Sequence, residues 1–304
     1  MNKTKNSSET LVQNKKKMRP GVIVSIVIMS ILSLAIILPL LYVVSVSFTS
    51  DKDIVQYGYR LIPHRICLDA YKHIFNTAHV ILRAYGVTIL VTILGTFCSL
   101  SLTTVIAYVA ARRDFPYRKL YSIFLLIPLL FNGGMVATYI VNSQVLHLTD
   151  TIFALFLPYS INVWYTFMMR SFMNNLPFEL VESAQIDGAG EFRTFFQIVL
   201  PLCKASLATI GLFYAFAYWN DWWLAMMYVS NPRLKPLQQL LQKIMANAEF
   251  YASMAPASMA QNQAIPKESL RMALAVVAIG PMLAVFPFFQ KYFVKGVTVG
   301  SVKG

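Results

Sequence analysis

Six apolar segments of membrane-spanning length limit what this chain can fold into. A helix needs about 20 mostly apolar residues to cross the hydrocarbon core of a bilayer. Inside hydrocarbon every backbone N–H and C=O must find its partner, which leaves only helices and closed barrels. The ten-residue alternation of a barrel strand is not visible in the sequence. We therefore predict an all-α membrane protein with six transmembrane helices at 21–48, 82–111, 120–141, 151–173, 203–229 and 270–293.

The composition agrees with a bilayer as the solvent of this chain. Of its residues, 57% are hydrophobic and only 13% are charged. The formal net charge of +13 could attract nucleic acid. In a chain this apolar, however, basic residues are more simply read as markers of the cytoplasmic side, so we predict no nucleic-acid partner.

The positions of Lys and Arg predict the orientation of the spans. Basic residues occur in the N-terminal tail, in "ARRDFPYRK" after the second span, around the loop at 177–201, and near the C-terminus. The loop at 142–150 has none, so we place it outside. Both termini are then cytoplasmic. The predicted parts are a basic cytoplasmic tail at 1–20, a six-span domain at 21–293 and a cytoplasmic C-terminal tail at 294–304. The apolar run of the first span is too long for a cleaved signal peptide.

Residues for catalysis or metal binding are missing from the sequence. Cys67, Cys98 and Cys203 are scattered, the four His residues form no HExxH, and no GxSxG occurs. There is also no GxxxxGK[ST] phosphate-binding loop. We predict a chain that is not an enzyme and holds no metal or cofactor of its own.

One polar loop interrupts the apolar pattern, with the sequence "VESAQIDGAGEFRTFFQIVLPL". Before it, Asn174, Asn175 and Pro177 are typical of a helix start, and the glycines of "DGAG" allow a sharp turn. The loop at 177–201 is thus predicted to be a helix-turn-helix on the cytoplasmic face. Its exposed face would offer Ala184 and the two glycines, ringed by Glu182, Asp187, Glu191 and Arg193. A partner protein would fit such a face. A helix lying on lipid is the alternative, but acidic residues disfavour it.

The spacing in this loop resembles the EAA motif of permease subunits in binding-protein-dependent ABC importers. That motif is EAA, three residues, G, nine residues and I-x-L-P, and Ser183 replaces its central alanine. "YWNDWW" and "PLQQLL" resemble the carbohydrate (maltose-type) branch, and "FNGGMVATY" with "FVKGVTVGSVKG" resembles its oligosaccharide permeases from Gram-positive bacteria. The residues that the motif marks for coupling to the ATPase are Glu182, Ser183, Ala184, Asp187, Gly188, Ala189, Ile198, Leu200 and Pro201.

This resemblance implies a type I importer permease and a set of partners. The loop at 177–201, called the coupling loop below, would dock on a separate ATPase present in two copies, which binds ATP and Mg. The other partners would be a second, non-identical permease and an extracellular, lipid-anchored sugar-binding protein. The implied location is the cell membrane of a Gram-positive bacterium.

A sugar path needs hydroxyl-bonding groups and flat aromatic faces, and two segments offer them. The candidates are Asn132, Gly133 and Gly134 in the third span, and Trp219, Asn220 and Asp221 in the fifth. An acidic side chain at membrane depth costs much free energy unless it faces water or a partner, so Asp221 is a functional candidate. For Asp221 the alternative is a helix cap or a place near the outer mouth, and for the glycines it is tight helix packing.

Two other functions stay open at this point. The solute could be something other than a sugar, although the carbohydrate-type segments argue against it. A stand-alone secondary transporter would need coupling carboxylates or broken helices in matching halves, and the spans contain little charge beyond Asp221.

Overall fold

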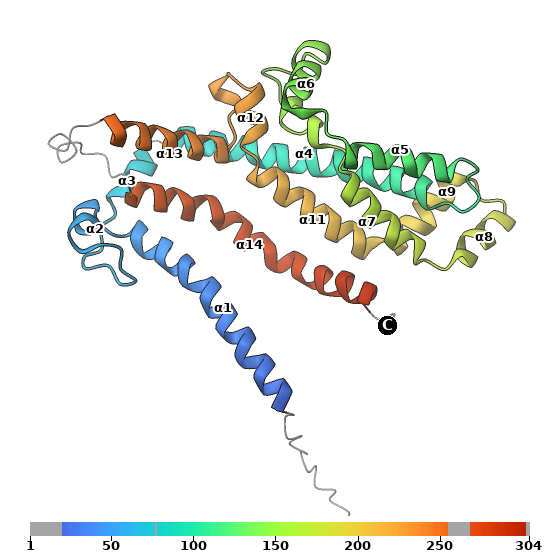
Figure 1. Ribbon diagram of the computed structural model, residues 1–304, viewed down its shortest axis with the longest axis horizontal. Coiled ribbons are helices and arrows are strands. Elements are labelled where there is room, and N and C mark those ends of the chain that lie inside the picture. Colours follow the sequence, from blue (N-terminus) through green and yellow to red (C-terminus); the bar gives the residue numbers. More distant parts are fainter. Residues whose placement is uncertain (1–19, 77, 255–267, 302–304) are drawn as a thin grey trace, which may run out of the picture.

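The computed structural model describes residues 20–76, 78–254 and 268–301, and all regular structure among them is helical (Figure 1). The predicted tail at 1–20 lies almost wholly outside the described residues. The first half of the chain contains α1 (Pro20–Ser47), α2 (Asp51–Tyr57), α3 (Asp69–Asn76), α4 (Ala78–Ala111), α5 (Arg118–Leu130), α6 (Gly134–Ile140) and the π-helix η1 (Val141–Val145).

The second half begins with two short 3-10 helices and ends with a long helix. Its elements are η2 (Phe153–Leu155), η3 (Leu157–Tyr159), α7 (Val163–Asn174), α8 (Phe178–Ile186), α9 (Glu191–Thr194), the π-helix η4 (Phe195–Val199), α10 (Leu200–Leu202), α11 (Lys204–Asn220), α12 (Trp223–Tyr228), the 3-10 helix η5 (Pro232–Leu234), α13 (Leu237–Met254) and α14 (Glu268–Ser301).

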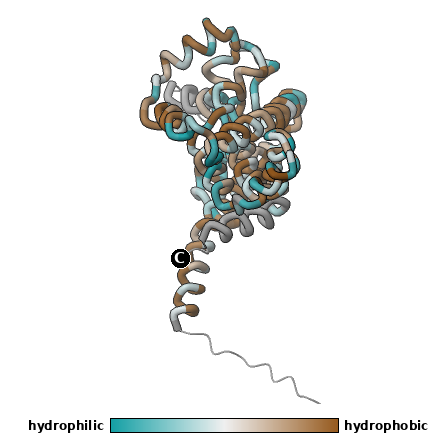
Figure 2. Tube along the Cα trace, turned by 90° about the vertical axis from the view of Figure 1, so that its right-hand side faces the viewer, coloured by the Kyte–Doolittle hydropathy of each residue, from teal (hydrophilic) through white to brown (hydrophobic). Residues whose placement is uncertain are grey.

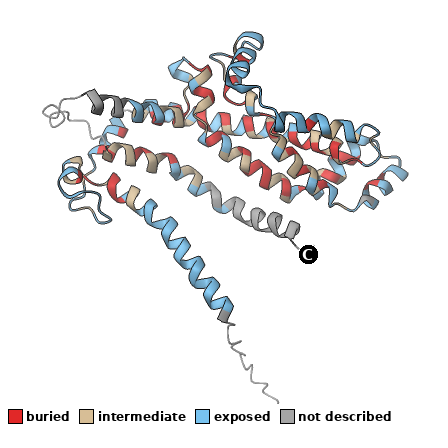
Figure 3. Cartoon of the chain, in the orientation of Figure 1, coloured by how far each residue is buried: buried red, intermediate tan, exposed pale blue. Residues whose placement is uncertain are grey.

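The largest cluster of buried apolar residues lies around α4, α7 and α11 (Figure 3). The sequence permits this close packing because α4 places small residues at four-residue steps on one face: Gly95, Ser99, Thr103 and Ala107. Small residues let helix backbones approach closely, which is how helices associate in membranes.

Hydrogen bonds between hydroxyl groups join α4 to α11 inside this core. Ser99 Oγ lies 2.7 Å from the Tyr218 hydroxyl, and Thr103 Oγ1 lies 2.7 Å from the Tyr214 hydroxyl. Tyr218 also donates to the carbonyl of Phe156 at 3.0 Å. Each of these four buried hydroxyls therefore has a partner, as a low-dielectric interior requires.

Helix α1 extends away from this core and lies beside α14 (Figure 1). None of the residues in its most apolar 18-residue window is buried, and its surface is strongly hydrophobic (Figures 2 and 3). An apolar surface of this size is stable against lipid or another apolar protein surface, not against water. The helix thus has the properties of a membrane span.

Fewer uninterrupted spans are present among the described residues than the sequence predicts. Two helices, Gly21–Ser47 and Ala78–Ala111, are long and apolar enough to cross a membrane, and two bent pairs could raise the number to four. The pair Arg118–Leu130 and Gly134–Val145 is bent by 110°, and the pair Glu191–Leu202 and Lys204–Asn220 by 81°. The count of six stays a prediction.

Four of the predicted spans differ from the helices observed. The fifth, 203–229, is divided into α11, which ends at Asn220, and the separate helix α12. The third predicted span, 120–141, is broken after Leu130, because Gly134 adopts a left-handed φ of +80°. The fourth, 151–173, begins as two 3-10 turns, and its α-helix starts only at Val163. The predicted boundary between the sixth span and the C-terminal tail does not coincide with a helix end, since α14 continues to Ser301.

The two ends of the bundle have different structures (Figure 1). Helices α8 and α9 lie at one end, together with the C-terminal end of α4. Helices α2, α3 and α13 lie at the other, where α3 and α13 contact α14. The polar loop singled out by the sequence is thus at the opposite end from the two long loops.

Candidate functional site

The coupling loop folds as a helix-turn-helix, as predicted, but its first helix starts later than the asparagines suggest. Asn174 is the last residue of α7 and Asn175 is its C-cap, so neither caps α8. Pro177 precedes the first turn of α8, with φ −58° and ψ 119°, and Glu179 lies in that turn. Proline at this place costs no hydrogen bond, and an acidic residue is favourable near the positive end of the helix dipole.

Gly188 ends α8 by a Schellman motif. The Gly188 N–H donates to the carbonyl of Gln185 at 3.0 Å, and the Ala189 N–H donates to that of Ala184 at 2.9 Å. Gly188 has a φ of +75°, which only glycine adopts without strain. A Cβ added at this position would meet no atom within 4 Å, so the surface above Gly188 is open.

The prediction that Ala184 belongs to the exposed face is wrong. Its side chain is buried, with 7% exposed, because it follows the buried Val181 by three residues and so lies on the same face of α8. Glu182 and Asp187 are exposed, as predicted, and Ser183 is exposed as well. Ser183 Oγ donates to the carbonyl of Glu179 at 2.7 Å, which explains how a serine fits here.

The second half of the loop is divided between a buried and an exposed side. Phe195 and Val199 are buried in η4, whereas Phe192 and Phe196 are exposed. Ile198, Leu200 and Pro201 lie in η4 and α10, at the junction with α11. The I-x-L-P part of the motif therefore attaches the loop to the next helix.

Two exposed apolar residues beside the turn were not among the predicted site residues. Ile186 is 81% exposed and Phe192 is 83% exposed, on either side of Gly188 and Gly190. Their sequence signal was weak, because an apolar residue in an amphipathic helix is usually assigned to the buried face. Both lie within four residues of Gly188, in the loop that also exposes Glu182 and Asp187.

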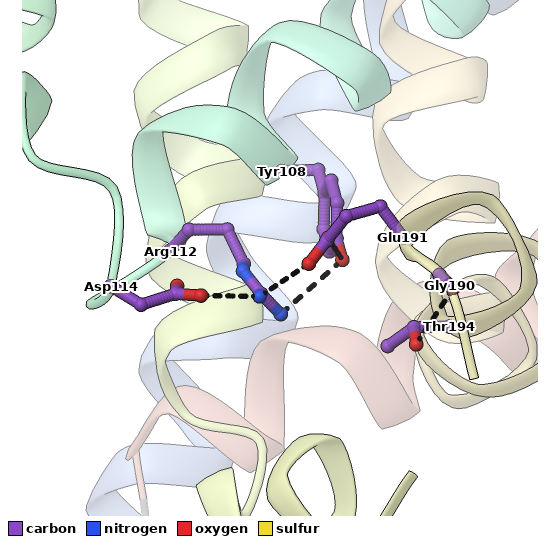
Figure 4. A network of polar contacts seen from close by, with 6 residues as sticks. All are labelled: Tyr108, Arg112, Asp114, Gly190, Glu191 and Thr194. Carbon is purple, nitrogen blue, oxygen red and sulfur yellow. Dashed lines mark hydrogen bonds and ion pairs between the residues drawn. The ribbon is translucent and has the colours of Figure 1, made fainter. Parts of the chain in front are cut away.

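A polar cluster joins the loop to α4, and its members Tyr108, Arg112, Asp114 and Glu191 are called the Arg112 cluster below (Figure 4). Arg112 Nη2 lies 2.6 Å from Glu191 Oε1 and 2.6 Å from Asp114 Oδ2. The Tyr108 hydroxyl donates to Glu191 Oε2 at 2.8 Å. Glu191 is exposed, as expected, and both of its carboxylate oxygens bind side chains at the C-terminal end of α4.

Within this cluster, Arg112 stabilises the charged form of Asp114. Partial burial raises the pKa of the Asp114 carboxyl. The hydrogen bond from Arg112 and the charge of its guanidinium lower this pKa, and they are among the causes that outweigh burial. The pKa of Asp114 therefore lies below its ordinary value. Asp114 therefore stays ionised beside Arg112 at neutral pH.

The candidate path residues of the third span lie at the break between α5 and α6. Asn132 Oδ1 accepts a hydrogen bond from the Gly134 N–H at 2.9 Å, and Gly134 has the left-handed backbone. All three residues are exposed. The glycine pair therefore makes a turn here. An added Cβ at Gly133 would meet only Ala137, at 4.0 Å, and one at Gly134 would meet nothing within 4 Å. No close contact therefore supports the alternative of tight helix packing.

The candidates of the fifth span have three different settings. Trp219 is buried and its Nε1 donates to the carbonyl of Ala278 in α14 at 3.3 Å. Asn220 is exposed and, with Trp219 and Gln238, lines a cavity of about 250 Å³ between α11, α13 and α14. Asp221 accepts a hydrogen bond from the Leu224 N–H at 3.1 Å, at the start of α12. The capping alternative for Asp221 thus has an observed contact.

Within the described parts of the chain, no group of three or more His, Cys, Asp or Glu side chains is placed to hold a metal ion.

Comparisons with known proteins identify the family. Residues 99–299 match the family described as "binding-protein-dependent transport system inner membrane component". Protein LplC of Bacillus subtilis is 40% identical over 268 residues, which cover 88% of this chain and 90% of the relative. The polygalacturonan/rhamnogalacturonan transport system permease protein YtcP of the same organism is 38% identical, over 90% and 94% of the two chains.

A solved structure has the same fold. It is described as a bacterial ABC transporter involved in the import of the acidic polysaccharide alginate, and one of its chains matches with a TM-score of 0.77 and 27% identity. The match covers 90% of this chain and 96% of that one. The fold is therefore that of a type I ABC importer permease, and the chain belongs to the family of inner membrane components of binding-protein-dependent transport systems.

Proposed function

We propose that this chain is one of two unlike permease subunits of an ABC importer for an oligosaccharide or related glycan fragment. An extracellular binding protein, anchored to lipid, would deliver the solute. Two copies of a separate ATPase would bind ATP and Mg and supply the energy, so this chain would itself be neither an enzyme nor a cofactor-binding protein. Family membership removes the stand-alone secondary transporter from the alternatives.

The observation that best supports this proposal is the exposed surface of the coupling loop. Ile186 and Phe192 are more than four-fifths exposed beside an open glycine turn, in a loop that also displays Glu182 and Asp187. Two large apolar side chains within a charged rim are typical of a protein interface. The motif residues are divided in this proposal: Glu182, Ser183, Asp187, Gly188 and Ala189 contact the ATPase, and Ala184, Ile198, Leu200 and Pro201 hold the loop in shape.

The proposed topology has six spans with both termini in the cytoplasm. The bent pairs at 118–145 and 191–220 support two of the spans beyond α1 and α4. In this orientation the coupling loop faces the cytoplasm, and the end formed by α2, α3 and α13 faces the binding protein. The two Bacillus relatives support a Gram-positive host and its cell membrane.

The proposed solute class rests on the names of the relatives. One of them is a polygalacturonan/rhamnogalacturonan permease, and the solved structure belongs to an alginate importer. Others are permeases for arabinooligosaccharides and for trehalose and maltose. The candidate path residues Asn132, Trp219 and Asn220 offer amides and an indole ring to a sugar. A non-sugar solute is the remaining alternative, and no described residue favours it.

Affinity purification of the tagged chain from its native membrane tests the proposal. Mass spectrometry should find a second permease of the same family, an ATPase and a sugar-binding protein in the purified material. If the chain is purified alone under conditions that preserve other membrane complexes, the proposal is wrong. The coupling loop would then be a helix that lies on lipid.

A further inference from the structure

Helix α4 contacts both α11 and the coupling loop. Gly95, Ser99 and Thr103 follow one another at four-residue steps in its middle and so share a side of the helix. Tyr108 lies in its last turn, and Arg112 directly follows its last residue, Ala111. Each of the four that bear a polar side chain has a partner outside α4.

In the middle of the bundle these partners are on α11. Ser99 and Thr103 bond to Tyr218 and Tyr214, which are one turn apart. Gly95 lies against the Tyr218 ring, where an added Cβ would be 2.8 Å from Cε2. A displacement of α4 along or about its axis would therefore also displace α11.

At the other end the partners are on the coupling loop. Arg112 is only 10% exposed in its side chain and binds Glu191 at 2.6 Å, while Tyr108 binds the second oxygen of the same carboxylate. The Tyr108 ring also packs against Phe195, with 4.9 Å between ring centroids. Two polar contacts and one aromatic contact thus attach residues 191–195 to the end of α4.

These contacts hold the coupling loop and the C-terminal end of α4 together. Charge-assisted hydrogen bonds of this length are about twice as strong as neutral ones. The Arg112 side chain is only 10% exposed, whereas that of Glu191 is 56% exposed, and loss of Glu191 leaves the guanidinium with Asp114 as a carboxylate partner. A movement of the loop is consequently more favourable with α4 attached than without it.

We propose that Arg112 and Glu191 are positioning residues that transmit movement of the coupling loop to α4, and through the two tyrosine contacts to α11. This inference rests on the proposed function, because it assumes that an ATPase moves the loop. It separates two roles within one loop: residues around Gly188 bind the partner, and the Arg112 cluster connects that binding to the spans.

The test compares amide hydrogen exchange in the purified complex before and after trapping with MgATP and vanadate. In the wild type, exchange at 104–112 and at 191–199 should change together on trapping. Glu191→Gln keeps the shape of the side chain but removes its charge. We expect it to retain the ATPase on purification and to reduce the trapping-induced change at 104–112 by about 2- to 30-fold, the range for residues along a coupling route.

Two further variants make the result specific. Arg112→Lys keeps the charge but loses the planar guanidinium, so it should give a smaller reduction of the same kind. Gln197→Ala is the control, since Gln197 lies in the same loop and its Oε1 accepts a hydrogen bond from Arg193 Nε; the change at 104–112 should be as in the wild type.

The other possible outcomes contradict either the proposed function or the positioning role. If the wild-type chain brings no ATPase with it, the proposed function itself fails. If the ATPase is present and Glu191→Gln shows the full change at 104–112, the positioning role is wrong while the proposed function stands. Loss of the ATPase from Glu191→Gln would place Glu191 in the docking surface instead, and would also overturn the positioning role.

Discussion

The ring of Tyr218 occupies the space directly beside Gly95: a Cβ at residue 95 would lie 2.8 Å from ring Cε2 and 2.9 Å from Cδ2. The Phe156 Cβ is also only 3.0 Å away. Gly95→Ala must therefore push α4 and α11 apart. We expect a loss of about 1–3 kcal/mol in the free energy of unfolding, typical of overpacking, measured by SDS titration of the purified permease.

Gly86 provides the matched control for this prediction. It lies in the same helix, but an added Cβ would meet nothing within 4 Å. Gly86→Ala should be neutral or raise stability by up to about 1 kcal/mol, since alanine is the better helix former. Equal effects of the two substitutions would show that the approach of α4 to Tyr218 is not as close as described.

The hydroxyl group of Tyr218 should contribute more to stability than that of Ser99. Tyrosine has one O–H, which donates to the Phe156 carbonyl, so Ser99 must be the donor to Tyr218. Ser99→Ala removes one bond, for which about 0.6 kcal/mol is usual between membrane helices. Tyr218→Phe removes both and should cost roughly twice as much. A larger loss in Ser99→Ala, in the same SDS titration, would contradict this assignment of donors.

How much of this structure the sequence predicts differs from one element to another. The apolar lengths predict α1 and α4 well, because a helix in lipid needs an unbroken apolar run. They fail at the third predicted span, since the left-handed Gly134 breaks the helix within an apolar sequence. Hydropathy reports how apolar a segment is. A turn made of apolar residues has the same hydropathy as an apolar helix, so the break cannot be seen in it.

The coupling loop was predictable in its turn but not in its faces. Gly188 has the positive φ that its place in the motif suggests. Ala184, in contrast, is buried and Ile186 is exposed, the reverse of what their size and hydrophobicity indicate. Which side of a short helix faces the bundle depends on contacts from distant parts of the chain, such as those that bury Val181. The exposure of Glu191 was predicted correctly, but its partner was not, because Arg112 is 79 residues away.

Gly188 and Gly190 should differ in their tolerance of alanine. Gly188 has a φ of +75°, and a left-handed residue with a Cβ costs about 1–2 kcal/mol. Gly190 has a φ of −67° and open space around it, so Gly190→Ala should be neutral or slightly stabilising. We expect Gly188→Ala to reduce the amount of ATPase recovered with the purified permease, and Gly190→Ala to leave it closer to the wild type. The reverse order would disprove the role of the Schellman turn.

Phe192 and Phe195 should have separate roles although they are three residues apart. Phe192 is 83% exposed, so Phe192→Ala should leave the free energy of unfolding nearly unchanged and weaken the recovery of the ATPase. Phe195 is buried and packs on Tyr108. Phe195→Ala should therefore lower stability by about 3–5 kcal/mol. Full recovery of the ATPase with Phe192→Ala combined with Ile186→Ala would show that the exposed apolar surface is not the docking surface.

Substitutions of Asp221 distinguish a helix cap from a path residue. Its carboxylate accepts a hydrogen bond from the Leu224 N–H at the start of α12. An asparagine amide oxygen accepts the same bond, whereas alanine cannot. If the cap is its role, Asp221→Asn should match the wild type in both stability and uptake of the labelled oligosaccharide that the importer takes up, and Asp221→Ala should lose about 0.5–2 kcal/mol of stability. We expect this result, because the contact at 3.1 Å gives the carboxylate a structural partner. A loss of uptake in Asp221→Asn with stability unchanged would instead require the charge itself, and Asp221 would then belong to the path.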